Sequence, residues 1–444
     1  MQILQKALLG RKIEDNQPPG TEDSKVTLSG TWNGQKRSFG LNEDVLSRNI
    51  LCIGGTGSGK TNAINMMLEG ILCDLKSDDV VIVFDTKQDY IKRFYKPERG
   101  DLVVGNSSMF KDETQKWNVF HDLNMGVSDD AALNMNVDDF SRGLFKDRGS
   151  DSQPFFANAA RDVFAAYLRA MLREGRSKES FRRSAWNNRS LVNYFNSADL
   201  SKYKTLSEAY PDLRGIQKYF GDGENLQGLG VMAELTSMVR DTFLGIFAED
   251  GDFSIRDFVR KKGGRVLFIE YDMALGNSLT AMYSMLIDLA LKEALGVQRS
   301  TGKVFFVLDE LKLLPKLEHL DDAVNFGRSM GIRVIGGLQS MAQLYEIYGE
   351  NQGVAVATGF LSLLAFRPND SFTRNFIKEH FGQILLLEQM LGANSIEPAR
   401  RLGYVAEDWV LAALNVGEAI IGLTGVPPFQ FTFDYIGSTT GGIA

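Results

Sequence analysis

The stretch that decides the fold is NILCIGGTGSGKTNAINMMLEGIL, residues 49–72. Its apolar start, Ile50–Ile53, is typical of a buried strand, and the glycine-rich run after it fits the pattern G-x-x-x-x-G-K-[ST]. Apolar residues then recur with helical spacing at positions 64, 67, 68, 71 and 72. A strand, a glycine loop and a helix in this order predict a P-loop, which binds nucleotide phosphates.

The residues of this loop predict how ATP would be held. Glycines let successive backbone N–H groups turn toward phosphate oxygens, and the following helix adds the positive end of its dipole. Lys60 is expected to reach the β- and γ-phosphates, and Thr61 to offer its hydroxyl to Mg²⁺. The predicted cofactor-binding residues are Gly54, Gly55, Thr56, Gly57, Ser58, Gly59, Lys60 and Thr61, together with Asp85.

A P-loop needs an acidic strand end beside it, and two apolar runs end in acids. DVVIVFD ends at Asp85, and KVFFVLDE ends at Asp309 and Glu310. The second run fits better: Asp309 would join the Mg²⁺ shell, and Glu310 would orient and polarise the attacking water. Asp85 is expected to close the strand beside the P-loop strand. The alternative for the acid pair is a strand end that merely faces solvent.

The order of apolar segments predicts an α/β fold. Strand-like runs alternate with helical patterns, which favours a mostly parallel sheet covered on both faces. Ligands bind such sheets at the carboxyl ends of the strands. Lys60, Asp85, Asp309, Glu310 and Gln339 all fall at such ends. The expected strands cover residues 50–54, 80–85, 265–271, 304–309, 332–338, 360–366 and 418–424.

The long separation between Lys60 and Asp309 predicts an insertion. Residues 121–250 carry helical patterns and no convincing strand, so we expect an all-α domain there. The nucleotide-binding domain is then formed by residues 48–120 and 251–444. Residues 1–47 form an entry segment with a small β-hairpin, from KVTLSGTW and KRSFGL.

Composition limits the other possibilities. The chain has 444 residues, 44% of them hydrophobic and 24% charged, as an ordinary globular protein has. A net charge of −7 means that any nucleic-acid contact must come from a local basic surface. Cys52 and Cys73 lie in apolar segments and are expected to be buried and inert, and the three histidines are too scattered for a metal site. No segment is typical of a signal peptide or membrane span.

These motifs together resemble the type IV coupling proteins, the TraD/TraG/TrwB-type ATPases of conjugation and type IV secretion. The resemblance covers residues 48 to 436 and is most specific in one block. That block is FVLDELKLLPKLEHLDDAVNFGRSMGIRVIGGLQSMAQL, residues 306–344. The segments GGTGSGKT, VVIVFDTKQDY, DGDFSIRDFV and LNVGEAIIGLTGVPP occur around it in the family's order.

The resemblance implies a RecA-like nucleotide-binding domain over residues 48–120 and 251–444. It also implies a homo-oligomer, a hexameric ring that hydrolyses ATP to move DNA, or a relaxase–DNA complex, into a type IV secretion channel. The family also places a glutamine where Gln339 stands, able to touch the γ-phosphate or the attacking water; the alternative is an ordinary cap between strand and helix. Family members usually carry N-terminal transmembrane helices, and this sequence has none. We therefore expect a cytoplasmic protein, at the inner face of the membrane if a separate anchor subunit recruits it. The other interpretations of the missing transmembrane helices are that the chain was trimmed or that it is a soluble relative of the family.

Two groups of positively charged residues are candidates for further roles. Arg328 is our candidate for an arginine that reaches the nucleotide of a neighbouring subunit, with Arg333 and Arg367 as alternatives. A helix-end arginine that binds carbonyls would look the same. Sequence-independent DNA contacts would come from residues 260–265 or from the helical segment, although such charge runs are more often solvated faces. The candidates in the helical segment are Arg176, Lys178, Arg182, Arg183 and Arg189.

Three functions fit the sequence. The first is a DNA-translocating coupling ATPase. The second is a soluble HerA/FtsK-like DNA translocase, which the missing membrane helices favour. The third is a nucleotide-gated docking module that recruits secreted protein substrates through the helical domain and hydrolyses little ATP.

Overall fold

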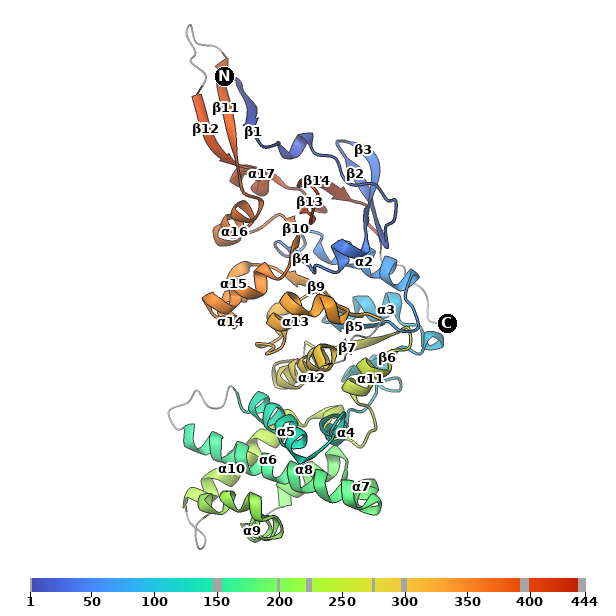
Figure 1. The fold of residues 1–444 in the computed structure, drawn as a ribbon, viewed down its shortest axis with the longest axis vertical. Helices are drawn as coiled ribbons and strands as arrows, with labels where there is room; N and C mark the ends of the chain where they lie inside the picture. Colours follow the sequence, from blue (N-terminus) through green and yellow to red (C-terminus); the bar gives the residue numbers. More distant parts are fainter. Residues whose placement is uncertain are drawn as a thin grey trace. The chain divides into compact units, whose positions relative to one another are not determined.

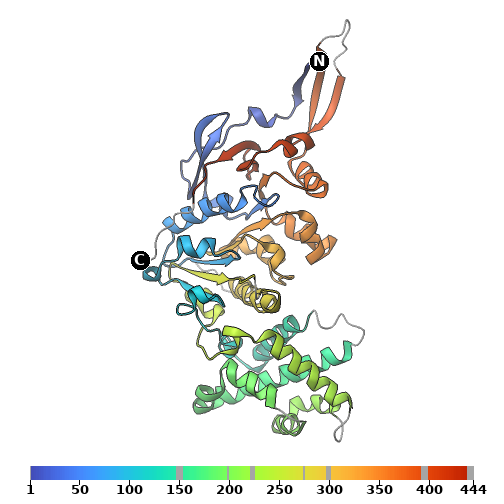
Figure 2. The same ribbon diagram turned by 180° about the vertical axis from the view of Figure 1, so that it is seen from behind.

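The chain folds into two compact units, which Figures 1 and 2 show as ribbons from opposite sides. The first comprises Met1–Asp101, Gly263–Val266 and Ala294–Ala444, and the second Leu102–Lys262 and Leu267–Glu293. The computed structural model describes residues 2–146, 154–197, 200–220, 226–273, 276–296, 302–391 and 399–437.

The core of the first unit is a run of five parallel strands. Their order is β10-β4-β9-β8-β5, and every residue of them is buried, as both faces are covered. The fold is therefore the α/β arrangement that the alternating pattern predicts, in the RecA-like form that the family resemblance implies. The strands are β4 (Ile50–Ile53), β5 (Val80–Asp85), β8 (Val304–Leu308), β9 (Ile332–Leu338) and β10 (Ser362–Phe366).

The position of β5 corrects one prediction. Asp85 was expected to end the strand next to the P-loop strand β4, but β9 and β8 lie between β4 and β5. Parallel strands are joined by crossovers, so strands that follow one another in the sequence need not be neighbours in the sheet. The strand before Asp309 and Glu310 is β8, and a single strand, β9, separates it from β4.

An antiparallel extension widens the sheet beyond β10. In order these strands are β13 (Glu418–Gly422), β14 (Phe429–Phe433), β2 (Val26–Trp32) and β3 (Gln35–Leu41). The β2–β3 hairpin is the one that the sequence predicts at the start of the chain. Its two turn residues are Asn33 and Gly34, with φ of 48° and 76°, as the favoured two-residue hairpin turn requires.

A small sheet stands apart from the large one within the same unit. It has the order β1-β11-β12 and projects beyond the large sheet in Figure 1. Its strands are β1 (Gln2–Leu9), β11 (Gln383–Leu391) and β12 (Ala399–Tyr404). The helices of this unit are α1 (Glu43–Leu46), α2 (Lys60–Cys73), α3 (Asp89–Phe94), α13 (Leu320–Phe326), α14 (Met341–Tyr348), α15 (Glu350–Thr358), α16 (Ser371–Phe381) and α17 (Asp408–Ala413).

The second unit is mainly helical. It contains a parallel pair, β6 (Leu102–Gly105) and the last four residues of β7 (Arg265–Glu270), and it extends beyond the predicted helical limits of 121–250. Part of that extension is α12, which joins this unit by packing. The ring centroid of its residue Tyr283 lies 5.5 Å from that of Phe247. The helices are α4 (Val119–Asn124), α5 (Asp130–Leu144), α6 (Pro154–Ser177), α7 (Glu179–Ala185), α8 (Asn188–Ser197), α9 (Leu200–Ala209), α10 (Leu226–Thr242), α11 (Ile255–Lys261) and most of α12 (Gly276–Gly296).

Asp122 ties together the two chain segments where the helical part begins and ends. Its carboxylate accepts hydrogen bonds from Ser254, from the backbone of Arg256 and from the indole of Trp117. Burial raises the pKa of Asp122, so these donors stabilise a carboxylate that has no access to water. These hydrogen bonds join the first and last segments of the helical part to each other.

Two remaining expectations concern the cysteines and the membrane. Cys52 is buried in β4, and burial raises the pKa of its thiol, as expected for an inert cysteine. The prediction for Cys73 is wrong: it is exposed, because it is the last residue of α2 and lies past the helix's buried face. Among the described residues, no helix is both long and apolar enough to cross a bilayer.

Candidate nucleotide-binding site

The P-loop is docked between neighbouring strand ends by backbone hydrogen bonds. Gly54 N donates to Leu338 O (3.1 Å), Gly55 N to Arg367 O (2.8 Å), and Gly417 N to Ser58 O (2.9 Å). Gly59 begins α2 with φ of 111°, and a Cβ there would lie 2.9 Å from the backbone of Gly417. Only glycine therefore fits this position, which explains why the sequence motif demands it.

Lys60 is held inside the loop. It is 7% exposed, and its Nζ donates to Gly54 O at 2.6 Å and to Gly55 O at 3.1 Å. Burial lowers the pKa of Lys60, an effect that the nearby carboxylates of Asp309 and Glu310 oppose. An anion bound in the loop would favour the charged ammonium in the same way.

Thr61 and Asp309, the predicted Mg²⁺ ligands, meet directly. Thr61 Oγ1 donates to Asp309 Oδ2 at 2.7 Å, across 248 residues of sequence. A second donor reaches the same oxygen: the hydroxyl of Tyr90, 2.8 Å away, which belongs to the buried second residue of α3. Sequence reasoning missed Tyr90, because nothing in its local pattern separates it from a core tyrosine.

Glu310 and Gln339, predicted as catalytic residues, are also in contact. Gln339 Nε2 donates to Glu310 Oε2 at 2.9 Å, and Thr56 Oγ1 donates to Gln339 Oε1 at 2.9 Å. A carboxylate only accepts hydrogen bonds, so the amide nitrogen must face Glu310 and the amide oxygen must face the P-loop. Glu310 Oε1 is buried and has no hydrogen-bond partner among the residues that the structure describes, which leaves one acceptor for a water molecule.

These residues surround a cavity of about 340 Å³. Its size is that of a small-molecule pocket, and it opens along the carboxyl ends of the parallel strands. The P-loop forms one wall, the acid pair and Gln339 another, and the segment after β14 closes one end. The lining residues are Thr56, Gly57, Ser58, Gly59, Lys60, Thr61, Asn62, Thr86, Lys87, Asp89, Asp309, Glu310, Gln339, Val416, Gly417, Phe433 and Tyr435.

Asp85 lies beneath this cavity and does not line it. Its carboxylate is fully buried and accepts hydrogen bonds from Lys87 N (3.2 Å) and Ile91 N (2.9 Å), which fixes the turn into α3. Burial raises the pKa of Asp85 to about 6. The residues that follow it, Thr86, Lys87 and Asp89, line the cavity instead.

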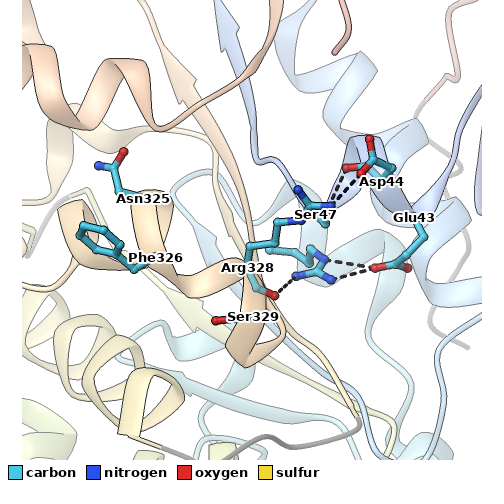
Figure 3. A pocket seen from close by; sticks show the side chains of 8 residues that line it. Glu43, Asp44, Ser47, Asn325, Phe326, Arg328 and Ser329 are labelled. Atoms are coloured by element: carbon cyan, nitrogen blue, oxygen red, sulfur yellow. Dashed lines mark hydrogen bonds and ion pairs between the residues drawn. The ribbon is translucent and has the colours of Figure 1, made fainter. Parts of the chain in front are cut away.

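Arg328 lies far from the P-loop of its own chain. It precedes β9, whereas Gln339 follows it, so about 20 Å of strand separates the two residues. Arg328 Nη2 donates to Asp44 Oδ1 at 2.8 Å beside a separate pocket of about 600 Å³. Figure 3 shows Glu43 and Asp44 on one side of this pocket, with Asn325 and Phe326 on the other.

The two alternative arginines differ sharply in exposure. Arg333 is nearly buried and forms a 2.9 Å ion pair with Glu43, so its guanidinium is committed within the chain. Arg367 is exposed at the end of β10, and its carbonyl holds the P-loop through Gly55 N. Among the three candidates, Arg328 combines exposure with a position remote from its own nucleotide site.

The basic residues predicted to contact DNA are largely paired with acids. In the helical part, Lys178 pairs with Glu174 and Arg183 with Glu179, both one helical turn apart. Such pairs are typical of a solvated helix face and lower the local positive charge. Further ion pairs of these candidates are Arg182–Glu179, Arg189–Asp250, Arg260–Glu293 and Lys261–Asp257.

The parallel sheet, the P-loop and the acidic strand end define a RecA-like P-loop NTPase. Residues 38–402 match the family described as the type IV secretion-system coupling protein DNA-binding domain, and the chain belongs to that family.

Relatives and solved structures agree with this assignment. The chain is 24% identical to the coupling protein TraD of Escherichia coli (strain K12) over 314 residues, which are 69% of the chain and 40% of TraD. It is 22% identical to the type IV secretion system-coupling protein VirD4 of Bartonella henselae over 315 residues, 66% of the chain and 48% of VirD4. The chain thus spans less than half the length of these relatives.

The fold resembles that of the plasmid coupling protein TrwB. The unbound monoclinic form of TrwBdeltaN70 has a TM-score of 0.70 at 21% identity, covering 93% of this chain and 89% of that one. TrwB in complex with ADP and Mg²⁺ has the same TM-score at 20% identity, with the same coverage of both chains. This likeness establishes the shared fold.

Proposed function

We propose that this chain is an ATP-hydrolysing motor that moves DNA, or a relaxase–DNA complex, toward a type IV secretion channel. The observation that carries the proposal is the contact of Thr61 with Asp309 beside the Thr56–Gln339–Glu310 chain. These contacts gather, at one cavity, the groups that phosphoryl transfer to water needs. The family match favours a coupling protein over a HerA/FtsK-like translocase.

The residues present fit ATP and Mg²⁺. A hydroxyl and a carboxylate oxygen 2.7 Å apart, Thr61 and Asp309, are the hard oxygen ligands that Mg²⁺ prefers. Ser58 Oγ is buried without a hydrogen-bond partner inside the loop, as expected of a group that awaits a phosphate oxygen. Bound Mg²⁺ would neutralise negative charge on the phosphates. The relative TrwB has been solved with ADP and Mg²⁺.

Each protein group has a separate task in this proposal. Lys60 and the loop N–H groups hold the phosphates, and Thr61 and Asp309 hold the metal. Glu310 accepts the proton of the attacking water at Oε1, since Gln339 already occupies Oε2. The burial of Glu310 Oε1 keeps that acceptor free of competing solvent.

Gln339 connects hydrolysis to the rest of the chain. It bridges the P-loop residue Thr56 and the base Glu310, so a shift of either one moves the end of β9. Directly after it, Ser340 caps α14 and contacts Thr373, which also binds Met341 N at 2.9 Å. Movement at the nucleotide would thereby reach both α14 and α16.

We further propose that the chain assembles into a homo-oligomer, a hexameric ring. In the ring, the guanidinium of Arg328 from one subunit would reach the nucleotide of its neighbour. Within the described chain, Arg328 is too far from the P-loop to act on its own nucleotide. Its exposed position beside the pocket between α1 and α13 suits contact with the cavity of a neighbouring subunit. Hydrolysis would then depend on ring formation.

ATPase rate against protein concentration, with and without single- and double-stranded DNA, tests the proposal. We expect the rate per chain to rise with concentration and with DNA. Lys60→Ala should lower the rate by about 100-fold or more, whereas Lys92→Ala, which changes an exposed lysine outside the cavity, should leave it unchanged. A rate that ignores both DNA and concentration would refute the motor. Tight binding of protein substrates with negligible turnover would favour the docking module.

A further inference from the structure

The end of the nucleotide cavity is formed by one prominent aromatic side chain. Tyr435 lies two residues after β14, lines the cavity and is 82% exposed. A single exposed aromatic residue is common on protein surfaces and by itself indicates nothing. What distinguishes Tyr435 is that the backbone on both sides of it is fastened to the phosphate-binding elements.

Asn62 provides the first fastening. It follows Thr61 in the first turn of α2, and its side-chain amide bonds the residues on either side of Tyr435. Asn62 Nδ2 donates to Asp434 O at 2.9 Å, and Asn62 Oδ1 accepts from Ile436 N at 3.0 Å. The position of Tyr435 is therefore set by the residue next to the predicted Mg²⁺ ligand.

Arg93 of α3 provides the second fastening. Its side chain is 15% exposed, and Nη1 donates to Ile436 O (3.3 Å) and Gly437 O (3.1 Å). Two helices that begin at the cavity, α2 and α3, thus hold the same short segment. Neither Asn62 nor Arg93 is needed in this arrangement for the acid pair or the P-loop.

A third connection runs through the backbone. Ser58 O of the P-loop accepts from Gly417 N at 2.9 Å, and Gly417 O accepts from Phe433 N at 2.8 Å. This chain of bonds joins the phosphate loop to the end of β14, two residues before Tyr435. The side chain of Val416, also exposed, lines the cavity at the same end.

We propose that Tyr435 is the platform on which the base of the bound nucleotide stacks. The inference rests on the proposed function, since it assumes a nucleotide whose phosphates occupy the P-loop. With the phosphates at residues 57–61 and the acid pair and Gln339 on another wall, the apolar and aromatic part of the lining is Val416, Phe433 and Tyr435. The backbone of Tyr435 is fixed, so only its two side-chain torsions are ordered when the ring stacks on a base.

The same geometry predicts how selective the platform is. The side-chain amide of Asn62 is occupied by the backbone around Tyr435, so it does not read the edge of a base. Stacking alone does not separate adenine from guanine, because each presents a large π-face. We therefore expect ADP and GDP to bind alike, and CDP, with its smaller ring, to bind more weakly.

Calorimetric titration with ADP and with inorganic tripolyphosphate, each with Mg²⁺, tests the platform. Tyr435→Ala should weaken ADP binding by about ten-fold or more and leave tripolyphosphate binding unchanged. Tyr435→Phe keeps the ring and should bind both ligands as the wild-type chain does. An exposed position tolerates either change, which a thermal unfolding curve checks.

The outcomes distinguish a failure of the stacking role of Tyr435 from a failure of the proposed function on which that role rests. Wild-type chain that binds neither ligand would overturn the proposed function and the platform with it. Wild-type chain that binds both, with Tyr435→Ala unchanged toward ADP, would overturn the platform alone. An equal loss of ADP and tripolyphosphate in Tyr435→Ala would also overturn it, since the residue would then support the loop and not the base.

Discussion

The hydroxyl of Tyr90 donates a 2.8 Å hydrogen bond to Asp309 Oδ2, the oxygen that Thr61 Oγ1 also reaches. The two donors come from different helices, α3 and α2, and fix one carboxylate oxygen from two directions. Tyr90 is 2% exposed, and burial raises its pKa well above the usual value, so the phenol stays a neutral donor at physiological pH. We infer that Tyr90 positions the metal ligand without touching the nucleotide.

Tyr90→Phe tests this positioning role. The buried ring remains, and one hydrogen bond of about 0.5–1.5 kcal/mol is lost, which corresponds to about a 2- to 13-fold effect. We expect the Mg²⁺ concentration that gives half the maximal ATPase rate to rise by about this factor. The effect should be the same at pH 6 and pH 9, because the phenol does not ionise in that range.

A matched control removes a hydroxyl outside the cavity. Tyr345 of α14 packs edge-on against Phe372, and Tyr345→Phe keeps that ring contact. Its Mg²⁺ dependence should match that of the wild-type chain. If Tyr90→Phe also matches it, the hydrogen bond to Asp309 has no role in metal binding.

The predicted site residues that the structure brings together at one cavity belong to local motifs. The P-loop lies within one strand–turn–helix unit, and Asp309, Glu310 and Gln339 each end a parallel strand. Parallel strands bring their carboxyl ends to one edge of the sheet, and β9 and β8 follow β4 in the strand order, so these residues meet at one cavity. Thr61 and Asp309 could therefore be paired from the sequence across 248 residues.

The places of Tyr90 and Tyr435 depend on the strand order, which the sequence does not determine, and that of Asp85 depends on a local turn. Tyr90 reaches Asp309 only because β5 lies beside β8 in the sheet. Asp85 was assigned to the site for its resemblance to an acidic strand end, yet its oxygens are used by the turn into α3. Tyr435 follows an antiparallel strand that no motif marks as part of the cavity.

Glu310→Gln tests the water-activating base. The amide keeps the shape of the side chain but cannot accept a proton, so we expect the ATPase rate to fall by about 100-fold or more. Binding of ADP with Mg²⁺ should stay within about two-fold, since Glu310 is not needed to hold the phosphates. The comparison requires calorimetry and a rate measurement on the same preparation.

Gln339→Ala tests the role of Gln339 in connecting Thr56 to Glu310 separately from the role of Glu310 as the base. It leaves Glu310 in place but removes the hydrogen bonds to Glu310 and Thr56. We expect a smaller loss of rate than in Glu310→Gln, together with weaker stimulation by DNA. Normal stimulation by DNA in this variant would argue against Gln339 as the connection between hydrolysis and movement.

The raised pKa of Asp85 predicts that the free energy of unfolding depends on pH. Burial raises its pKa from 3.8 to about 6, so between these values the folded state binds more protons than the unfolded chain. The free energy of unfolding therefore loses up to about 3 kcal/mol as the pH rises from about 4 to 7. Denaturant unfolding at several pH values measures this contribution.

Asp85→Asn isolates this group from the other carboxylates. The asparagine does not titrate, although it loses one of the two hydrogen bonds from the backbone of the turn. The difference in unfolding free energy, wild type minus variant, should therefore decrease as the pH rises through about 6. A constant difference across this range would show that Asp85 titrates normally.

The position of Arg328 predicts that hydrolysis is completed between subunits. Its ion pair with Asp44 is about half exposed, and exposed pairs contribute little to stability, so a neighbour's phosphates could draw the guanidinium away. Arg328→Ala should abolish the rise of ATPase rate with protein concentration. Arg48→Ala removes the other arginine bound to Asp44 and should leave that rise intact.

Mixing two inactive variants provides the decisive form of this experiment. Arg328→Ala chains keep an intact nucleotide cavity, and Lys60→Ala chains keep Arg328. In a mixed ring, an Arg328→Ala subunit would receive the arginine of its Lys60→Ala neighbour, so the mixture should recover part of the wild-type rate. The Arg328→Ala chains alone lack the concentration-dependent rate and the Lys60→Ala chains hydrolyse little ATP, so recovery of that rate requires that the two residues of one working site come from different chains. A mixture as inactive as its components, although it assembles, would exclude Arg328 as the residue that acts across the interface.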